Sequence, residues 1–258
     1  MGYFTPKSYL ELLQTLGNEF ALTTFLAFIL SQQPNNAILR HDVDKMPRNA
    51  LRFAQIEHEQ GICATYYFRI VPESFDPGII RQIASLGHEI GYHYEDMDLC
   101  KGDVDKAYQS FQSNLARLRE IVPIETACMH GSPMSKYDNR DIWKKYDYRE
   151  LGIIGEPYFD IDYNQVFYLT DTGRSWNSSD VSIRDKVRSP FRIKVKNTSH
   201  LIELIRTGDL PDQIMINTHP QRWNDNWFYW TRELVWQSVK NQVKRFVSRR
   251  SSQKKSAD

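Results

Sequence analysis

Short apolar runs alternate with amphipathic stretches along most of this chain. The runs are rich in β-branched and aromatic residues, which favour strands, and the stretches between them repeat apolar residues at helical spacing. The clearest helix is predicted over residues 103–120, where apolar side chains recur on one face from Val104 to Leu118. Because strands that alternate with helices are typical of crossover connections, the sequence predicts an α/β fold.

The predicted elements fill one domain. Strands are predicted at residues 37–44, 62–70, 88–94, 126–130, 152–155, 166–170 and 213–219, and helices at residues 21–30, 47–60, 79–86, 103–120 and 200–206. A long loop is expected at residues 172–188. The domain is predicted to span residues 1–250, with an N-terminal helical extension (1–36), a barrel (37–220) and a C-terminal helix (221–250), followed by a disordered basic tail (251–258).

Composition narrows the possible partners. The 258 residues, of which 41% are hydrophobic and 25% charged, are enough to bury a core. Lys and Arg number 33 against 32 Asp and Glu, and this net charge of +1 argues against a nucleic-acid partner. The apolar segment Ala21–Leu30 is too short to cross a bilayer and lacks the flanks of a signal peptide. Three cysteines without a C-x-x-C pair indicate a reducing, cytoplasmic setting.

Reactive side chains gather where the predicted strands end. Four of the seven histidines occupy such positions, namely His41, His93, His130 and His219. Functional groups of parallel α/β sheets collect at the carboxyl ends of the strands, because the following loops converge there. We therefore expect a site at this edge of the sheet.

Asp42 and Asp44 stand two residues apart on one predicted strand, so both carboxylates leave the same face. Two carboxylates this close repel each other, which favours a bound divalent cation, although strand-end aspartates also cap the next helix. With His93 nearby, the combination of imidazole and carboxylate suits Zn²⁺ or a similar transition metal. His88 lies five residues before His93, so the two rings point to opposite faces and His88 is expected to be structural.

Three stretches carry a family resemblance: residues 39–44 (LRHDVD), 87–93 (GHEIGYH) and 216–219 (INTH). In order and spacing they make the sequence, over roughly residues 37–220, similar to the polysaccharide deacetylases, also called carbohydrate esterase family 4 or the NodB-homology group. The resemblance implies a distorted (β/α)7-type barrel of the glycoside hydrolase and deacetylase kind, here with an added N-terminal and an added C-terminal helix. It also implies that Asp42 is the catalytic base, His219 the general acid, and Asp44 and His93 metal ligands.

The ion expected at this site is Zn²⁺, with Co²⁺, Ni²⁺ or Mn²⁺ as alternatives. The family's second metal-binding histidine corresponds to Met97 here, so the third ligand is not assigned. Candidates for it are Glu95, Asp96, Asp98 and His130, and a site completed by water is another possibility.

Two further positions differ from the family pattern. The arginine that orients the base is missing from the stretch at residues 129–133, and Arg174 is a candidate substitute, unless it only forms a surface pair with Asp171. His41 replaces a phenylalanine and places a second imidazole near the metal. Trp176 and Trp223 could stack on a sugar ring, although core packing explains most tryptophans.

The function that we expect is that of a metal-dependent amide hydrolase, which removes an N-acyl group, in particular N-acetyl, from an amino sugar or glycoconjugate intermediate. Hydrolysis of another non-peptide C–N bond, in a cyclic imide or an N-acylated metabolite, is an alternative on the same fold. A catalytically silent barrel that serves as a binding module is a third possibility. The expected partner is a carbohydrate or an N-acylated small molecule, and the sequence does not predict an oligomeric state.

Overall fold

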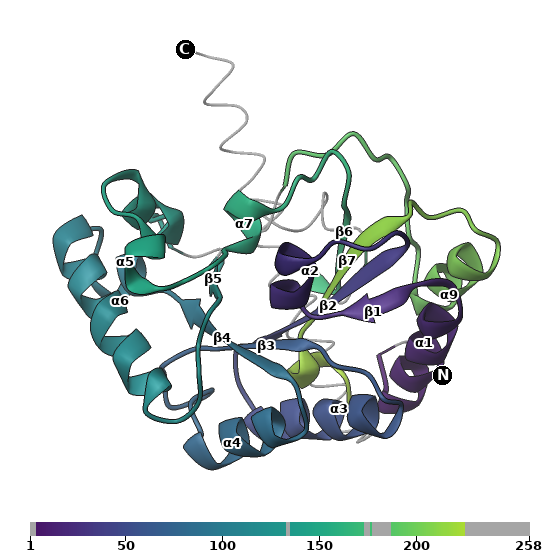
Figure 1. Cartoon of the computed structure of the whole chain (residues 1–258), viewed down its shortest axis with the longest axis horizontal. Coiled ribbons are helices and arrows are strands. Elements are labelled where there is room, and N and C mark those ends of the chain that lie inside the picture. The colour runs from purple at the N-terminus through teal and green to yellow at the C-terminus, as the bar shows by residue number, and fades with distance from the viewer. Residues whose placement is uncertain (1–3, 133–134, 173–175, 177–186, 225–258) are drawn as a thin grey trace.

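Seven parallel strands form one sheet that curls into a half-barrel, with helices around it (Figure 1). The computed structural model describes residues 4–132, 135–172, 176 and 187–224. The strands are β1 (Ala21–Thr23), β2 (Asn36–Val43), β3 (Thr65–Phe68), β4 (Glu89–Tyr94), β5 (Ala127–Met129), β6 (Phe167–Thr170) and β7 (Gln213–Thr218). The predicted α/β fold of the barrel kind is thereby confirmed.

The helices follow the order expected for crossover connections. The α-helices are α1 (Pro6–Glu19), α2 (Phe25–Leu30), α3 (Pro47–Glu59), α4 (Pro77–Ser85), α5 (Asp96–Leu99), α6 (Val104–Arg119), α7 (Pro157–Asp160) and α9 (Thr198–Arg206). Short 3-10 turns are η1 (Asn139–Lys144), η2 (Tyr148–Leu151) and η4 (Pro220–Arg222). In Figure 1, α6, α4, α3, α1 and α9 form an arc outside the sheet, whereas α2 lies inside the curve.

Strand β2 lies in the middle of the sheet, whose strand order is β5-β4-β3-β2-β7-β6. It pairs in parallel with β3 and β7, and its first residues also pair with β1. All eight of its residues are buried, as expected for a strand that is covered on both faces. Because every pairing is parallel, the carboxyl ends of β2, β3, β4, β5 and β7 meet at one edge.

Two apolar clusters cover the two faces of the sheet. The larger one lies between the sheet and the outer helices and includes Leu39 of β2 and Phe53 of α3. The smaller one fills the concave side, where Ile38 of β2 packs with Phe25 and Phe28 of α2. The alternation of neighbouring β2 side chains between these clusters decides which residues can reach the inside of the half-barrel.

The segment Ala21–Leu30, predicted as one helix, instead begins with β1 and becomes helical only at Phe25. Thr24 interrupts it, because its backbone is extended and its side chain accepts a hydrogen bond from the amide of Ala27 at 3.1 Å. This is an N-cap, which starts a new helix. Among the described residues no helix combines the length and apolarity needed to cross a membrane.

The strand predicted at residues 152–155 is also wrong. Gly152 adopts a left-handed conformation with φ of 70° after η2, and only Gly155 forms an isolated parallel bridge, to Thr126. A Cβ at Gly155 would lie 2.2 Å from Ile29 Cδ1, so a side chain there would have to push the end of the Ile29 side chain aside. The predicted helix at 221–250 and tail at 251–258 lie outside the described residues, except for 221–224, which belong to η4 and its exit.

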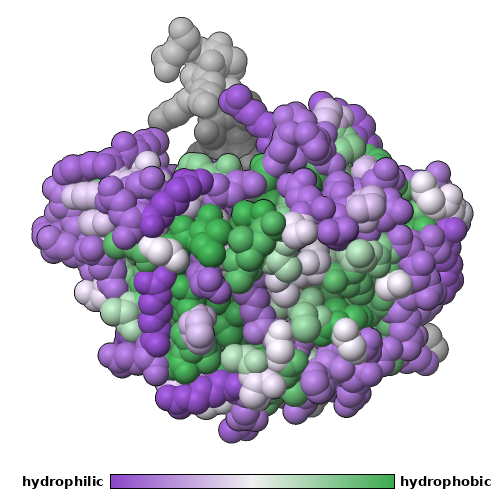
Figure 2. All heavy atoms as spheres, in the orientation of Figure 1, coloured by the Kyte–Doolittle hydropathy of each residue, from purple (hydrophilic) through white to green (hydrophobic). Residues whose placement is uncertain are grey.

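The surface of the view in Figure 1 is apolar near its centre and polar around its margin (Figure 2). Exposed large apolar side chains of the described residues include Leu30 of α2, Ile154 and Phe159.

A buried polar network lies on the outer side of the sheet, around Glu57 of α3. Glu57 is fully buried and accepts hydrogen bonds from the hydroxyls of Tyr9 and Tyr66, while His41 Nε2 lies 2.7 Å from its Oε1. His88 accepts the amide of Ala64 at Nδ1, so its proton is on Nε2, 2.9 Å from a backbone carbonyl. Burial lowers the pKa of His88, and this histidine is structural, as predicted.

Replacement of Glu57 should be strongly destabilising. Burial opposes ionisation of Glu57, but His41, His88 and Tyr66 together outweigh burial, so the pKa of Glu57 lies below its usual value. We expect Glu57→Ala to lower the free energy of unfolding by about 3–5 kcal/mol in urea titrations at pH 7, since it leaves several buried polar groups without a hydrogen-bond partner. Exposed Glu59 on the same helix is the control, with an expected loss below about 0.5 kcal/mol for Glu59→Ala.

The same pair of variants tests how the contribution of Glu57 to the free energy of unfolding depends on pH. A carboxylate whose pKa is depressed by folding stabilises the protein above its unfolded pKa of about 4.3 and loses that contribution as the pH falls. The difference between wild type and Glu57→Ala should therefore narrow below about pH 4. Equal effects of the two substitutions at pH 7 would contradict this account of Glu57.

Candidate metal centre

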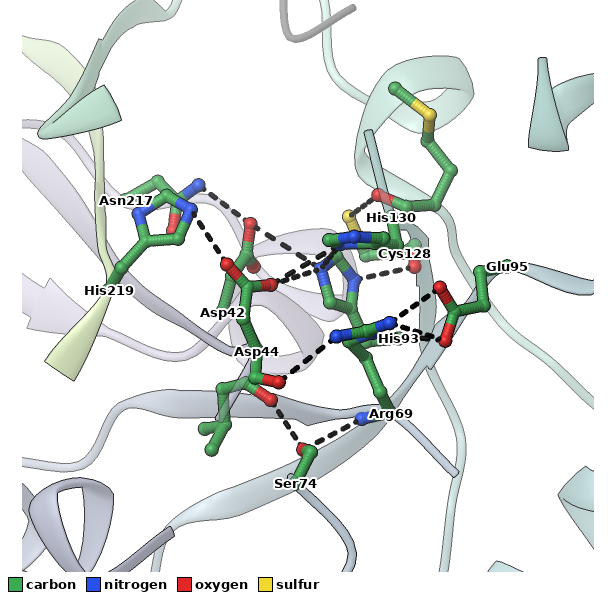
Figure 3. A network of polar contacts seen from close by, with 12 residues as sticks. Asp42, Asp44, Arg69, Ser74, His93, Glu95, Cys128, His130, Asn217 and His219 are labelled. Atoms are coloured by element: carbon green, nitrogen blue, oxygen red, sulfur yellow. Dashed lines mark hydrogen bonds and ion pairs between the residues drawn. The ribbon is translucent and has the colours of Figure 1, made fainter. Parts of the chain in front are cut away.

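The candidate centre lies at the carboxyl edge of the sheet and starts from β2. Because side chains alternate along a strand, Arg40 and Asp42 point to the concave side, whereas His41 and Val43 point to the convex side. Asp44 follows directly after the strand. Its carboxylate lies between His219 and the pair of His93 and His130 (Figure 3).

Three donor atoms form a nearly equilateral triangle. His130 Nδ1 lies 3.2 Å from His93 Nε2 and 3.3 Å from Asp44 Oδ1, and His93 Nε2 lies 3.6 Å from Asp44 Oδ1. Ligands that bind Zn²⁺ tetrahedrally at about 2.0–2.2 Å stand about 3.3–3.6 Å from one another. The three atoms thus have the spacing of one face of a tetrahedral metal site, and they form one of the metal-compatible groups of the described residues.

The chemistry of these donors also fits a cation. Asp44 Oδ1 is buried and has no hydrogen-bond donor among the described residues, although its neighbour Oδ2 has one. Nδ1 of His93 lies 3.0 Å from the carbonyl oxygen of Cys128, a contact that holds the proton on Nδ1 and turns the Nε2 lone pair toward Asp44. A carbonyl behind an imidazole is the usual support of a metal-binding histidine.

The electrostatics of the cluster favour an ionised Asp44. Burial opposes its ionisation, but His130 and His93 outweigh burial and hold the pKa of Asp44 well below its usual value. Conversely, burial disfavours the charged form of His130, but the carboxylate of Asp44 raises the pKa of this imidazole above its usual value.

Of the candidates for the third ligand, His130 is the one that lies beside Asp44 and His93. Its amide donates to the carbonyl of Tyr94 at 2.7 Å, which continues the pairing of β4 and β5 by one residue. Asn139 holds the carbonyl of His130 at 2.8 Å and, through its own oxygen, the amide of Met97 at 3.0 Å. Met97 itself is buried in the core, 3% exposed, and contributes no ligand. The second imidazole of the cluster therefore comes from the end of β5 rather than from α5.

The other candidates for the third ligand bind elsewhere. Glu95 forms a two-pronged ion pair with Arg69, at 2.7–3.0 Å, and Arg69 also donates to the carbonyl of Asp44 at 3.1 Å. Asp96 accepts hydrogen bonds from Tyr92 at 2.7 Å and from neighbouring polar groups of α6. Asp98 bonds to Ser135. Glu95 thus supports the backbone of Asp44 instead of binding the metal.

Asp42, the predicted base, is held by a residue that the sequence analysis missed. Arg40 Nε lies 2.9 Å from Asp42 Oδ1 and Arg40 Nη2 lies 2.8 Å from Oδ2, and Asn217 of β7 donates to Oδ2 at 2.8 Å. Burial opposes ionisation of Asp42, but Arg40, His93 and His219 outweigh it and lower the pKa of Asp42 strongly. The signal was present in the sequence, because Arg40 and Asp42 are two residues apart and share a strand face.

His219, the predicted acid, is oriented by Asp171. Its Nδ1 lies 2.6 Å from Asp171 Oδ1, and its backbone amide donates to Oδ2 at 3.0 Å. Arg222 and Trp223 donate to the same carboxylate at 2.7 Å each. Burial opposes ionisation of Asp171, but His219 and Arg222 outweigh it, so its pKa lies below the usual value. Nε2 of His219 is left facing Asp44 Oδ2, 3.9 Å away.

Arg174, a candidate substitute for the missing arginine, lies outside the described residues. Asp171, its suggested partner in a surface pair, is buried and pairs with Arg222. The placement of His41 beside the metal is wrong. Its ring lies on the convex side, with Nδ1 2.7 Å from Thr218 Oγ1 and Nε2 against Glu57. His41 is the neighbour of Asp42 on β2, and neighbouring side chains of a strand point to opposite faces of the sheet.

The two tryptophans proposed to stack on a sugar are buried in the core. Trp176 is 1% exposed and Trp223 is 2% exposed, and they pack against each other and against Phe4. Neither ring offers a face to a ligand, so the predicted stacking role is wrong in this arrangement. Trp223 acts on the site through its hydrogen bond to Asp171.

A second metal-compatible group consists of Asp42, His93 and Cys128. Both groups contain His93, so the two are alternative sites for one ion. Both oxygens of Asp42 already accept hydrogen bonds from Arg40, whereas Asp44 Oδ1 accepts none among the described residues. The group of Asp44, His93 and His130 is therefore the better candidate.

Together these features define an α/β half-barrel with a cluster of one carboxylate and two imidazoles at its strand ends. No protein-family model matches the sequence, and no curated protein is similar to it. One solved structure with a similar fold is a mutant of the peptidoglycan deacetylase PdaC from Bacillus subtilis. The alignment covers 83% of this chain and 96% of that chain, with 11% identity and a TM-score of 0.38, so the likeness is distant.

The ligand role of His130 is testable by metal titration. We expect His130→Ala to weaken Zn²⁺ binding by more than the about 10–100-fold that loss of an outer partner costs, because a direct ligand is removed. Competition with a chromophoric chelator measures the affinity. Met97→Leu, a volume-conserving change of a buried residue that is not one of the three donors, should leave the affinity near that of the wild type. The reverse ranking of the two variants would rule out His130 as the ligand.

Proposed function

We propose that this protein is a metal-dependent hydrolase that removes an N-acyl group, in particular N-acetyl, from an amino sugar or glycoconjugate intermediate. The observation that carries the proposal is the placement of one carboxylate and one imidazole beside the triangle of Asp44, His93 and His130. Asp42 Oδ2 lies 3.9 Å from His93 Nε2, and His219 Nε2 lies 3.9 Å from Asp44 Oδ2. A base and an acid next to a shared centre are what amide hydrolysis requires.

The three donors would hold a divalent cation, for which Zn²⁺ is the first choice. When bound, such an ion acts as a Lewis acid toward the acyl carbonyl and lowers the pKa of a water molecule. The remaining steps fall to side chains of the chain itself. Asp42 is ionised at neutral pH and can accept the proton of the attacking water, and the bonds from Arg40 and Asn217 fix the direction of its carboxylate.

His219 supplies the proton that the leaving nitrogen needs. An amine is a poor leaving group until it is protonated, so an amide hydrolase requires a general acid close to the nitrogen. Asp171 Oδ1 lies 2.6 Å from Nδ1 of His219 and fixes the orientation of the ring, so that Nε2 faces Asp44 and would donate the proton. This dyad favours a hydrolase over a silent binding module, because binding alone gives no reason to orient an imidazole in this way. The cytoplasmic location stays a prediction.

The first test is a screen for acetate release. We expect the Zn²⁺- or Co²⁺-loaded protein to release acetate from at least one of UDP-N-acetylhexosamines, chito-oligomers and lipid-linked N-acetyl sugars. Removal of the metal with a chelator should abolish release, and added metal should restore it. Absence of release from all three classes at full metal occupancy would contradict the proposal.

The variant His219→Ala tests whether His219 is a general acid or a metal ligand. Turnover should fall by about 10²–10⁴-fold, the usual contribution of a general acid, while the metal stays bound. Metal content by atomic emission and the rate of acetate release are the two measurements. His58→Ala, which changes an exposed histidine of α3, serves as the control. Loss of metal from His219→Ala would make His219 a ligand instead.

Arg40→Met tests the residue that orients the base. We expect a loss of turnover of at least about 10²-fold, because the carboxylate of Asp42 loses two of its three hydrogen bonds. Metal affinity should change little, since Arg40 contacts none of the three proposed ligands. Arg81→Met, at an exposed position of α4, controls for the loss of a positive charge. Full activity of Arg40→Met would contradict the proposed role of Arg40 in orienting Asp42.

A further inference from the structure

Gln221 carries a buried hydrogen-bond acceptor that no step above uses. The side chain belongs to η4, directly after His219 and Pro220, and the residue is only 5% exposed. Its Oε1 has no hydrogen-bond donor among the residues that the structure describes. Buried acceptors are nearly always paired, and one left unpaired at a site points to a donor that arrives with the ligand.

The orientation of the Gln221 amide follows from its partner. Nε2 donates to Asp44 Oδ2 at 3.0 Å. An ionised carboxylate can only accept hydrogen bonds, so the amide nitrogen must face Asp44, and the flipped arrangement would set two oxygens against each other. The carbonyl oxygen of Gln221 therefore points away from Asp44 and stays available as an acceptor.

Gln221 and His219 flank the same oxygen atom. Asp44 Oδ2 lies 3.0 Å from Gln221 Nε2 and 3.9 Å from His219 Nε2. A leaving nitrogen that receives a proton from His219 must come within hydrogen-bonding distance of Nε2. His219 Nε2 and the amide nitrogen of Gln221 thus both lie within 3.9 Å of the oxygen that they share. The leaving nitrogen of a secondary amide carries one N–H group, whereas the leaving oxygen of an ester carries none.

We propose that Gln221 Oε1 accepts a hydrogen bond from the N–H of the acyl-amide, so that the site selects N-acyl over O-acyl groups. The inference rests on the proposed function, because it places Gln221 on the leaving-group side of that reaction. Sites that hydrogen-bond a substrate N–H discriminate strongly against analogues without it, since the protein's buried polar group is then left unpaired. Gln221 is thus a specificity-determining residue.

The test compares two probes that differ in one linkage: methyl 2-acetamido-2-deoxy-β-D-glucopyranoside and methyl 2-O-acetyl-β-D-glucopyranoside. NMR titration gives the dissociation constant of each for Zn²⁺-loaded protein whose metal content has been verified. We expect the wild type to bind the acetamide more tightly than the ester, by about 10-fold or more. Gln221→Met, of similar length but without the acceptor, should lose most of that ratio.

Gln221→Glu is the matched variant, because it keeps an oxygen acceptor and removes the donor to Asp44. Its ratio of acetamide to ester binding should exceed that of Gln221→Met, even if both affinities fall. Equal binding of the two probes by the wild type, or an unchanged ratio in Gln221→Met, would overturn the inference. Acetamide preference without any acetate release would contradict the proposed function and support Gln221. Acetate release with equal binding of the probes would contradict the role of Gln221 alone.

Discussion

The register of β2 in the middle of the sheet is the constraint on which the site depends. Alternation along this strand sends Arg40 and Asp42 to the concave side and His41 to the convex side. The first two residues form the pair that fixes the base, and His41 joins the buried network of Glu57. A shift of β2 by one residue would exchange these environments and break both networks. Parallel pairing then brings the ends of β4, β5 and β7 to the same edge.

Buried charge at this edge is compensated separately for three of the carboxylates. Asp42 has Arg40, Asp171 has His219 and Arg222, and Glu95 has Arg69. Asp44 differs from these three, because one of its oxygens faces only the two imidazoles. Removal of a charge from water without a partner is costly, so a cation at this position would complete the pattern. The same physical requirement explains why the site is built from ion pairs rather than from isolated groups.

Much of the site could be predicted from the sequence, and particular residues show why the rest could not. Strand periodicity was sufficient to place Asp42 and Asp44 and to separate His88 from His93. The same rule would have moved His41 away from the metal and brought in Arg40, had it been applied to both neighbours of Asp42. The choice of His130 depends on how β4 and β5 align, and the partner of Asp171 depends on the turn after β7. Both features depend on contacts between segments that are distant in the sequence, and no local sequence pattern predicts such contacts.

Sequence patterns likewise located most strands and helices of the fold, but they erred where short segments are decided by packing. Ala21–Leu30 reads as one apolar helix, yet Thr24 divides it so that β1 can join the sheet. Packing also decides the role of Trp176 and Trp223. Both lie close to site residues in the sequence, but their rings are buried in the core and cannot stack on a sugar.

The measurement that tests the central claim most directly is anomalous diffraction at the zinc edge from crystals of the zinc-loaded protein. The account predicts one strong peak about 2.0–2.2 Å from Asp44 Oδ1, His93 Nε2 and His130 Nδ1. A peak bound by Asp42 and Cys128, or zinc found only at other positions, would contradict it.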